Sequence, residues 1–239
     1  MNLIEKLNVL INDSNNIVFF GGAGVSTESG IPDFRSVDGL YHLKYDYPPE
    51  QILSRSFFQK KPEEFYRFYY DKMIYQNAAP NITHKRLAEL EAAGKLKAVI
   101  TQNIDGLHQS AGSKNVIELH GSIHMNHCTS CGTFYTLDEV LMKAPLPRCA
   151  CEGIIKPEVV LYEEPLKDRN IQAAIKAISE ADLLLIGGTS LSVYPAAGFI
   201  DYYKGNKLVL INKSATPLDS KADLLLSLPL GEVMSALLV

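Results

Sequence analysis

IVFFGGAG, residues 17–24, joins a short apolar run to a glycine-rich turn. Similar apolar runs recur at residues 98–100, 116–119, 183–186, 208–211 and 224–228. They are too short for helices and do not alternate with polar residues, which is typical of parallel strands buried on both faces. Helical patterns lie between them, such as the stripe of Ile171, Ala174, Ile175 and Ile178. The sequence therefore predicts a doubly wound α/β fold with a parallel, Rossmann-like sheet.

Composition and charge narrow the class of protein. The chain has 239 residues, of which 46% are hydrophobic, and a formal net charge of −4. This length and apolar content fit one large domain and exclude disorder. No apolar run approaches the roughly 20 residues of a membrane span, the N-terminus lacks a signal-peptide pattern, and basic residues do not cluster. We therefore expect a cytoplasmic protein without membrane or direct nucleic-acid partners.

Two segments interrupt the alternation of strands and helices. Residues 36–80 are rich in aromatic side chains and predict a small helical insert, and residues 122–155 contain all four cysteines and predict a second insert. The Rossmann-like part is then expected to comprise residues 1–35, 81–121 and 156–239. A cleft between a nucleotide-binding sheet and its insertions is the default place for a binding site.

The glycine-rich turn, residues 22–30, is the first candidate site. Glycines there allow backbone N–H groups at the start of a helix to approach a diphosphate. Thr27 stands where the dinucleotide-binding fingerprint has its third glycine, so a tight turn without a ligand is an equally good interpretation. The segment that follows contains Phe34 and Arg35. An arginine can pair with phosphate, and a phenylalanine can shield a reactive ring carbon from water.

Polar side chains follow the next two predicted strands. Gln102, Asn103 and Asp105 follow the run at 98–100, and His120 follows the run at 116–119. The carboxyl ends of parallel strands meet at one edge of a sheet, so we expect these groups to share a crevice with the glycine turn. A histidine can accept a proton near neutral pH. Alternatively, Asn103 and Asp105 cap the next helix and His120 is a structural residue.

The four cysteines form two close pairs, Cys128-x-x-Cys131 and Cys149-x-Cys151. In a reducing compartment this spacing favours a four-thiolate zinc site over disulfides, although the second pair is one residue short. Four thiolates leave no coordination position open to water, so such a site is structural. Free buried thiols are the alternative, and His124 or His127 is close enough in sequence to replace a cysteine of the short pair.

Five motifs, taken in order, resemble the sirtuins, the NAD-dependent protein-lysine deacylases. They are GAGVSTESGIPDFRS (22–36), TQNIDGLH (101–108), ELHGS (118–122), the cysteine pairs and GGTSLSVYPAA (187–197). The likeness covers almost the whole chain and is greatest to short bacterial and archaeal members. It implies a single catalytic core, residues 1–239, that transfers acetyl from acetyl-lysine proteins or peptides to ADP-ribose, with release of nicotinamide and O-acetyl-ADP-ribose. Mono-ADP-ribosyl transfer, NAD hydrolysis, removal of other short neutral acyl groups and NAD sensing without catalysis are the alternatives.

The resemblance also implies residue roles. His120 matches the general base, and Asn103 is expected beside the ribose. The positions that match NAD contacts are Ala23, Gly24, Thr27, Phe34, Arg35, Gln102, Ile104, Asp105, Thr189, Ser190 and Asn212.

A peptide is implied to pair with two loops, residues 162–164 and 191–194. Val160, Tyr162, Glu164 and Val193 are its expected contacts. The commonest form of the first loop is Phe-Gly-Glu, whereas this chain has Tyr-Glu-Glu. Relatives that prefer acidic acyl groups have an arginine three positions after a tyrosine of the helical insert. Here Tyr66 is followed by Tyr69, which predicts a preference for short neutral acyl groups.

Overall fold

The structure is a computed structural model, and it describes residues 1–34 and 45–238. Its main sheet has six strands in the order β3-β2-β1-β7-β8-β9, and every neighbouring pair is parallel. The predicted doubly wound α/β fold is therefore confirmed. The strands are β1 (Ile17–Gly21), β2 (Leu96–Thr101), β3 (Val116–Glu118), β7 (Leu183–Gly187), β8 (Leu208–Ile211) and β9 (Leu224–Leu226).

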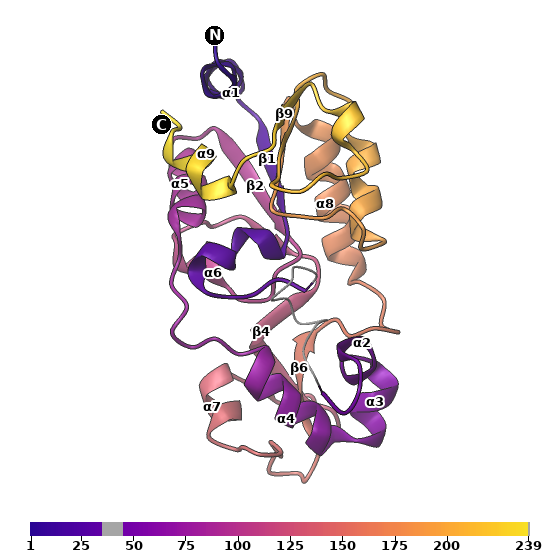
Figure 1. Cartoon of the computed structure of the whole chain (residues 1–239). Coiled ribbons are helices and arrows are strands. Elements are labelled where there is room, and N and C mark those ends of the chain that lie inside the picture. The colour runs from indigo at the N-terminus through magenta and orange to yellow at the C-terminus, as the bar shows by residue number, and fades with distance from the viewer. Residues whose placement is uncertain (35–44, 239) are drawn as a thin grey trace.

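Helices cover both faces of this sheet (Figure 1). One face packs on α1 (Leu3–Asn12), α5 (Ile82–Ala92) and α9 (Leu230–Ser235), and the other packs on α8 (Asp168–Glu180) and a 3-10 segment, η4 (Ala196–Tyr202). Alternate residues of β1 serve the two faces: Phe19 joins the core of α1 and α5, whereas Phe20 joins that of α8. Burial on both faces explains why the strand sequences lack polar alternation.

A second, antiparallel sheet has the order β5-β4-β6 and lies at the other end of the molecule (Figure 1). Helices of the aromatic segment pack on it, and the two share one core in which Phe65 and Tyr66 lie with Ile155 and Val159. The described helices within residues 45–80 and the cysteine-containing sheet, which were predicted in separate inserts, therefore form one small module. Its elements are α2 (Pro49–Ile52), α3 (Arg55–Lys60), α4 (Pro62–Lys72), β4 (Gly121–Cys128), β5 (Phe134–Tyr135), α7 (Leu137–Leu141) and β6 (Ile155–Val159).

β6 pairs with β4 as far as Val159, so the small sheet includes residues on both sides of position 155. The exact division of the chain into domains stays a prediction. Of the helices that the structure describes, none has the length and apolar character needed to span a bilayer.

Gly121 is the point at which the chain leaves the large sheet for the small one. Its φ is +76°, and a Cβ atom there would lie 1.7 Å from the carbonyl oxygen of Glu158. Only glycine fits this crossing, because any side chain would collide with the β6 backbone. The crossing holds His120, the preceding residue, at the junction of the two sheets.

Candidate active site

A cleft of about 1730 Å³ contains every predicted binding and catalytic residue that the structure describes. Arg35 lies outside the described residues. Residues of the glycine turn, of both strand ends and of both peptide loops therefore share one space, although their roles stay predictions. The predicted residues that line the cleft are Ala23, Gly24, Thr27, Phe34, Gln102, Asn103, Ile104, Asp105, His120, Val160, Tyr162, Glu164, Thr189, Ser190, Val193 and Asn212.

Two glycine-containing loops meet backbone to backbone at the base of this cleft. The Gly24 N–H donates to the carbonyl of Gly188 at 2.8 Å. Gly188 has φ +60°, and a Cβ there would lie 2.5 Å from the Val25 nitrogen. Such close packing leaves main-chain surface where side chains would otherwise stand, which suits a phosphate-containing ligand.

The chain after Gly22 differs from the sequence prediction of a helix start. It forms two short 3-10 turns, η1 (Ala23–Val25) and η2 (Thr27–Ser29), and no α-helix. Gly30, in the left-handed conformation with φ +83°, ends the second turn. Pro32 follows two residues later and cannot donate a helical backbone hydrogen bond, so the turn is not extended.

The polar residues after β2 are linked across the cleft. Gln102 donates from Nε2 to the hydroxyl of Thr189 at 3.0 Å. Asn103 donates from Nδ2 to the hydroxyl of Ser26 at 3.0 Å, and this hydroxyl donates to Asp105 Oδ2 at 2.6 Å. The other oxygen of Asp105 accepts from the backbone N–H of Leu107, the first residue of α6 (Leu107–Ser110).

Helix capping therefore accounts for one oxygen of Asp105 and does not account for Asn103. The remaining contacts of these residues join two strand ends. They orient amide and carboxylate groups into the cleft.

His120 is held at both its side chain and its backbone. Its Nδ1 lies 2.9 Å from the carbonyl oxygen of Gln102, and its own carbonyl accepts from the N–H of Val160 at 2.9 Å. A carbonyl only accepts, so Nδ1 carries the proton and Nε2 of the neutral ring has the lone pair. Burial lowers the pKa of His120 below its ordinary value, while the bond to Gln102 acts in the opposite direction. The ring is therefore neutral at pH 7 and able to accept a proton.

The first predicted peptide loop is fixed by contacts on its outer side. Tyr162 donates from its N–H to the Leu53 carbonyl at 2.9 Å and accepts from the Arg55 N–H at 3.0 Å. The carboxylate of Glu164 accepts from Lys156 Nζ at 3.1 Å and from the N–H of Leu161 at 2.9 Å. The Tyr162 side chain is 44% exposed at the cleft. Glu164 is thus engaged in an internal ion pair.

Tyr66 and Tyr69 are both buried in the core of the small module. The Tyr66 hydroxyl donates to the Ile155 carbonyl. Neither tyrosine is among the described residues that line the cleft. Tyr66 therefore serves the core of the small module, where its hydroxyl also finds its partner.

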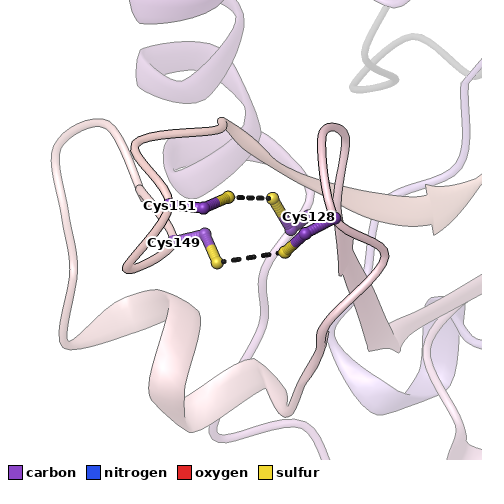
Figure 2. A group of neighbouring side chains, drawn as sticks. Cys128, Cys149 and Cys151 are labelled. Carbon is purple, nitrogen blue, oxygen red and sulfur yellow. Dashed lines mark hydrogen bonds between the residues drawn. The ribbon is translucent and has the colours of Figure 1, made fainter.

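The four cysteine thiols converge, with all their sulfur atoms within 4.8 Å of one another. The Sγ atoms of Cys128 and Cys151 lie 3.5 Å apart, as do those of Cys131 and Cys149. Figure 2 shows Cys149 and Cys151 facing Cys128 across the site. Tetrahedral zinc with Zn–S bonds of about 2.3 Å places its thiolates about 3.8 Å apart, so this arrangement fits the metal. The short spacing of the second pair does not keep either thiol out of the group.

The two histidines considered as replacement ligands lie elsewhere. His127 pairs through Nδ1 with Glu158 at 3.0 Å, and His124 Nε2 lies 3.1 Å from the carbonyl oxygen of Asp105. Among the described residues, the group of possible metal ligands contains the four cysteines and no histidine.

Sequence reasoning did not find two residues that shape the site. Ser26, which connects Asn103 to Asp105, is buried inside the glycine turn. The side-chain oxygen of Asn81 caps α5. Its side-chain Nδ2 donates to the Val25 carbonyl at 2.7 Å and to the Ser29 hydroxyl at 3.0 Å. An asparagine before a helical pattern signals a cap, but nothing local reveals the second pair of contacts.

Comparison with known proteins gives a consistent result. The Sir2 family model matches residues 22–195. A protein of Clostridium perfringens (strain 13 / Type A), called NAD-dependent protein deacetylase, is 61% identical over 235 residues, which cover 97% of this chain and 96% of the relative.

Two solved structures give the same picture. One, described as Sir2–p53 peptide–NAD+, superposes with a TM-score of 0.88 at 41% identity, covering 98% of this chain and 96% of the other. A Sir2 complex with an inhibitor, 2'-O-acetyl-ADP-ribose and deacetylated p53 peptide superposes with a TM-score of 0.85 at 40% identity, covering 97% and 96%.

Proposed function

The chain belongs to the Sir2 family, and on that premise we propose that it is an NAD-dependent protein deacetylase, which transfers the acetyl group of acetyl-lysine to ADP-ribose and releases nicotinamide. The observation that carries this proposal is the state of His120. Its Nδ1 is held by Gln102, and its proton-free Nε2 belongs to a ring that lines the cleft where the strand ends meet.

NAD supplies the ribose carbon that accepts the acyl oxygen as nicotinamide departs. The two glycine loops, around Gly24 and Gly188, are proposed to receive its diphosphate against bare backbone. Asp105, oriented by Ser26 and by the Leu107 N–H, is proposed to bind the carboxamide of nicotinamide. Phe34 lines the same cleft and is proposed to exclude water from the ribose.

His120 is proposed as the general base. A base must hold a lone pair toward the proton that it removes and be neutral at the working pH. The Gln102 contact fixes the tautomer that leaves Nε2 free, and burial keeps the imidazole neutral. Nε2 would take a proton from a ribose hydroxyl, and Asn103, which lines the same cleft, would orient the sugar.

We also propose that the four cysteines hold a zinc ion with a structural role. Four thiolates complete its coordination, and the described lining of the cleft includes none of them. The ion would fasten the loop of the first cysteine pair to the loop of the second.

The substrate is proposed to be an acetylated protein or peptide, and short neutral acyl groups are proposed to be preferred over acidic ones. The second point rests on the resemblance, because relatives that prefer acidic acyl groups have an arginine at the position where this chain has the buried Tyr69. It is tested by comparing kcat/KM on acetyl-lysine and succinyl-lysine versions of one peptide. A higher value for the succinyl peptide would contradict it.

The main experiment follows an acetyl-lysine peptide by mass spectrometry with and without NAD. Loss of acetyl from the peptide should require NAD and should match the appearance of O-acetyl-ADP-ribose. Consumption of NAD at the same rate without peptide would instead indicate an NAD hydrolase or ADP-ribosyltransferase.

The role of His120 is tested by His120→Ala, which should lower kcat by about 100-fold or more because general-base catalysis is lost. NAD binding should persist. His127→Ala is the matched control, since His127 pairs with Glu158 outside the cleft. Normal turnover by His120→Ala would remove His120 from the mechanism.

A further inference from the structure

We propose that Glu163 is a positioning residue, which holds the loop of residues 162–164 in the shape that receives the acyl-peptide. The proposal rests on the proposed function, because that function assigns this loop to the peptide. The contacts of Glu163 themselves are observed in the structure and do not depend on the role proposed for the loop.

Glu163 makes a two-point contact with helix α3. Its Oε2 accepts from the backbone N–H of Ser56 at 2.9 Å, and its Oε1 accepts from the Ser56 hydroxyl at 2.9 Å. Ser56 lies in the first turn of α3, two residues after the cap at Ser54. Hydrogen bonds to an ionised carboxylate are stronger than neutral ones, and two together fix its orientation. The side chain therefore fastens the loop to the helical part of the small module.

The backbone of Glu163 has a conformation that a glutamate seldom adopts. Its φ is +73°, in the left-handed region where glycine is the usual residue. The commonest form of this loop in sirtuins has glycine at that position. A non-glycine residue remains in such a conformation only where surrounding contacts hold it, and the contact with Ser56 is one that does so. Compared with glycine, glutamate at position 163 thus has less backbone freedom but supplies a side chain that bonds to Ser56.

Two further contacts hold the same loop, one at the start of α3 and one at β6. Tyr162 forms an isolated parallel bridge with Ser54, and Glu164 pairs with Lys156 of β6. Glu163 adds a side-chain tie to the start of α3, beside the backbone bridge of Tyr162. A loop held on its outer side in this way loses less conformational freedom when a peptide binds to its inner side.

The expected effect is confined to the peptide. Glu163→Gly should raise the KM for acetyl-peptide by about 3- to 10-fold, because an anchored loop becomes a flexible one. The KM for NAD and kcat should stay within about twofold, since the Glu163 carboxylate bonds to Ser56 of α3 and has no part in the proposed chemistry. Ser56→Ala removes one of the two donors and should give a smaller change of the same kind. The double variant should match Glu163→Gly alone, because Ser56 acts through Glu163.

Two more variants separate the anchor from charge and backbone effects. Glu163→Gln keeps the length of the side chain and the backbone strain but loses the carboxylate, so its KM for peptide should also rise. Glu63→Gln removes the same charge from α4 of the same module and should leave the KM for peptide unchanged.

Hydrogen–deuterium exchange of residues 160–165 provides a readout that does not depend on activity. Exchange in the protein without ligands should be faster in Glu163→Gly and Ser56→Ala than in the parent or in Glu63→Gln. Equal exchange in all four proteins, or a KM for peptide in Glu163→Gly at or below the parental value, would overturn the anchor. Absence of deacetylation by the parent protein would instead contradict the proposed function. The exchange measurement alone would then show whether Glu163 holds the loop.

Discussion

Lowering the pH from 7 to 5 should destabilise this protein through two buried histidines. His84 of α5 and His108 of α6 are 0% and 1% exposed, and their ring centroids lie 4.7 Å apart. Within residues 1–34 and 45–238, neither ring nitrogen of His108 has a hydrogen-bond partner, nor has Nε2 of His84. Protonation of either ring would place a charge in an apolar interior without a partner.

Burial lowers the pKa of His84 to about 4 and that of His108 to about 3. Asp105 opposes the shift of His84, whereas His84 adds to that of His108. The unfolded chain titrates near 6.5, so below that pH it binds protons that the folded protein does not. Stability is therefore complete above pH 6.5 and is lost as the pH falls toward the folded pKa values.

The magnitude follows from linkage. Each histidine removes nearly 1.4 kcal/mol of unfolding free energy per pH unit below 6.5, which amounts to about 2 kcal/mol at pH 5. The pair together contributes a loss of about 4 kcal/mol between pH 7 and pH 5.

The assay is urea unfolding followed by circular dichroism at pH 7, 6 and 5, for the parent and for His108→Leu. Leucine fills the site and forfeits no hydrogen bond from the ring nitrogens. The variant should lose about 2 kcal/mol less than the parent over this range. Contributions from carboxylates and from the cysteine site are common to both proteins and cancel in the comparison. Equal pH dependence in the two proteins would refute the reasoning.

Three further predictions concern the loops. Asn81→Ala should lower the free energy of unfolding by about 1–2 kcal/mol, because the cap of α5 is lost, and should weaken NAD binding in a calorimetric titration, because the tie to Val25 and Ser29 is lost as well. Gly188→Ala should lower the melting temperature and NAD affinity together, since the added Cβ would meet the Val25 nitrogen at 2.5 Å; normal NAD binding would contradict the close packing of the two loops. Metal analysis should find one zinc per chain, and its removal by a chelator should abolish the near-ultraviolet dichroism of tyrosines in the small module until zinc is restored.

The strands of the large sheet were predictable because they are buried on both faces. The run at 208–211, for example, coincides with β8, and the run at 183–186 falls one residue short of β7. β4 gave no comparable signal. Its sequence, GSIHMNHC, mixes buried and exposed positions without strict alternation, because only part of the strand is covered.

The candidate site also has a part that could be predicted from the sequence and a part that could not. His120 and Asp105 follow strands, and parallel strands end at one edge, so their meeting could be expected from sequence. The contacts that orient them could not. Ser26 and Asp105 are 79 positions apart, and Glu163 is 107 positions from Ser56. Each is an ordinary residue in its own segment and acquires its contact only when the fold brings distant segments together.

The common core of the aromatic helices and the cysteine sheet has a consequence for recombination. Neither segment can be removed, or exchanged alone for that of a homologue. Removing one segment would expose to water the apolar surface of the other that it covers. Chimeras should fold only when the segment that precedes β2 and the segment that follows β3 are exchanged together.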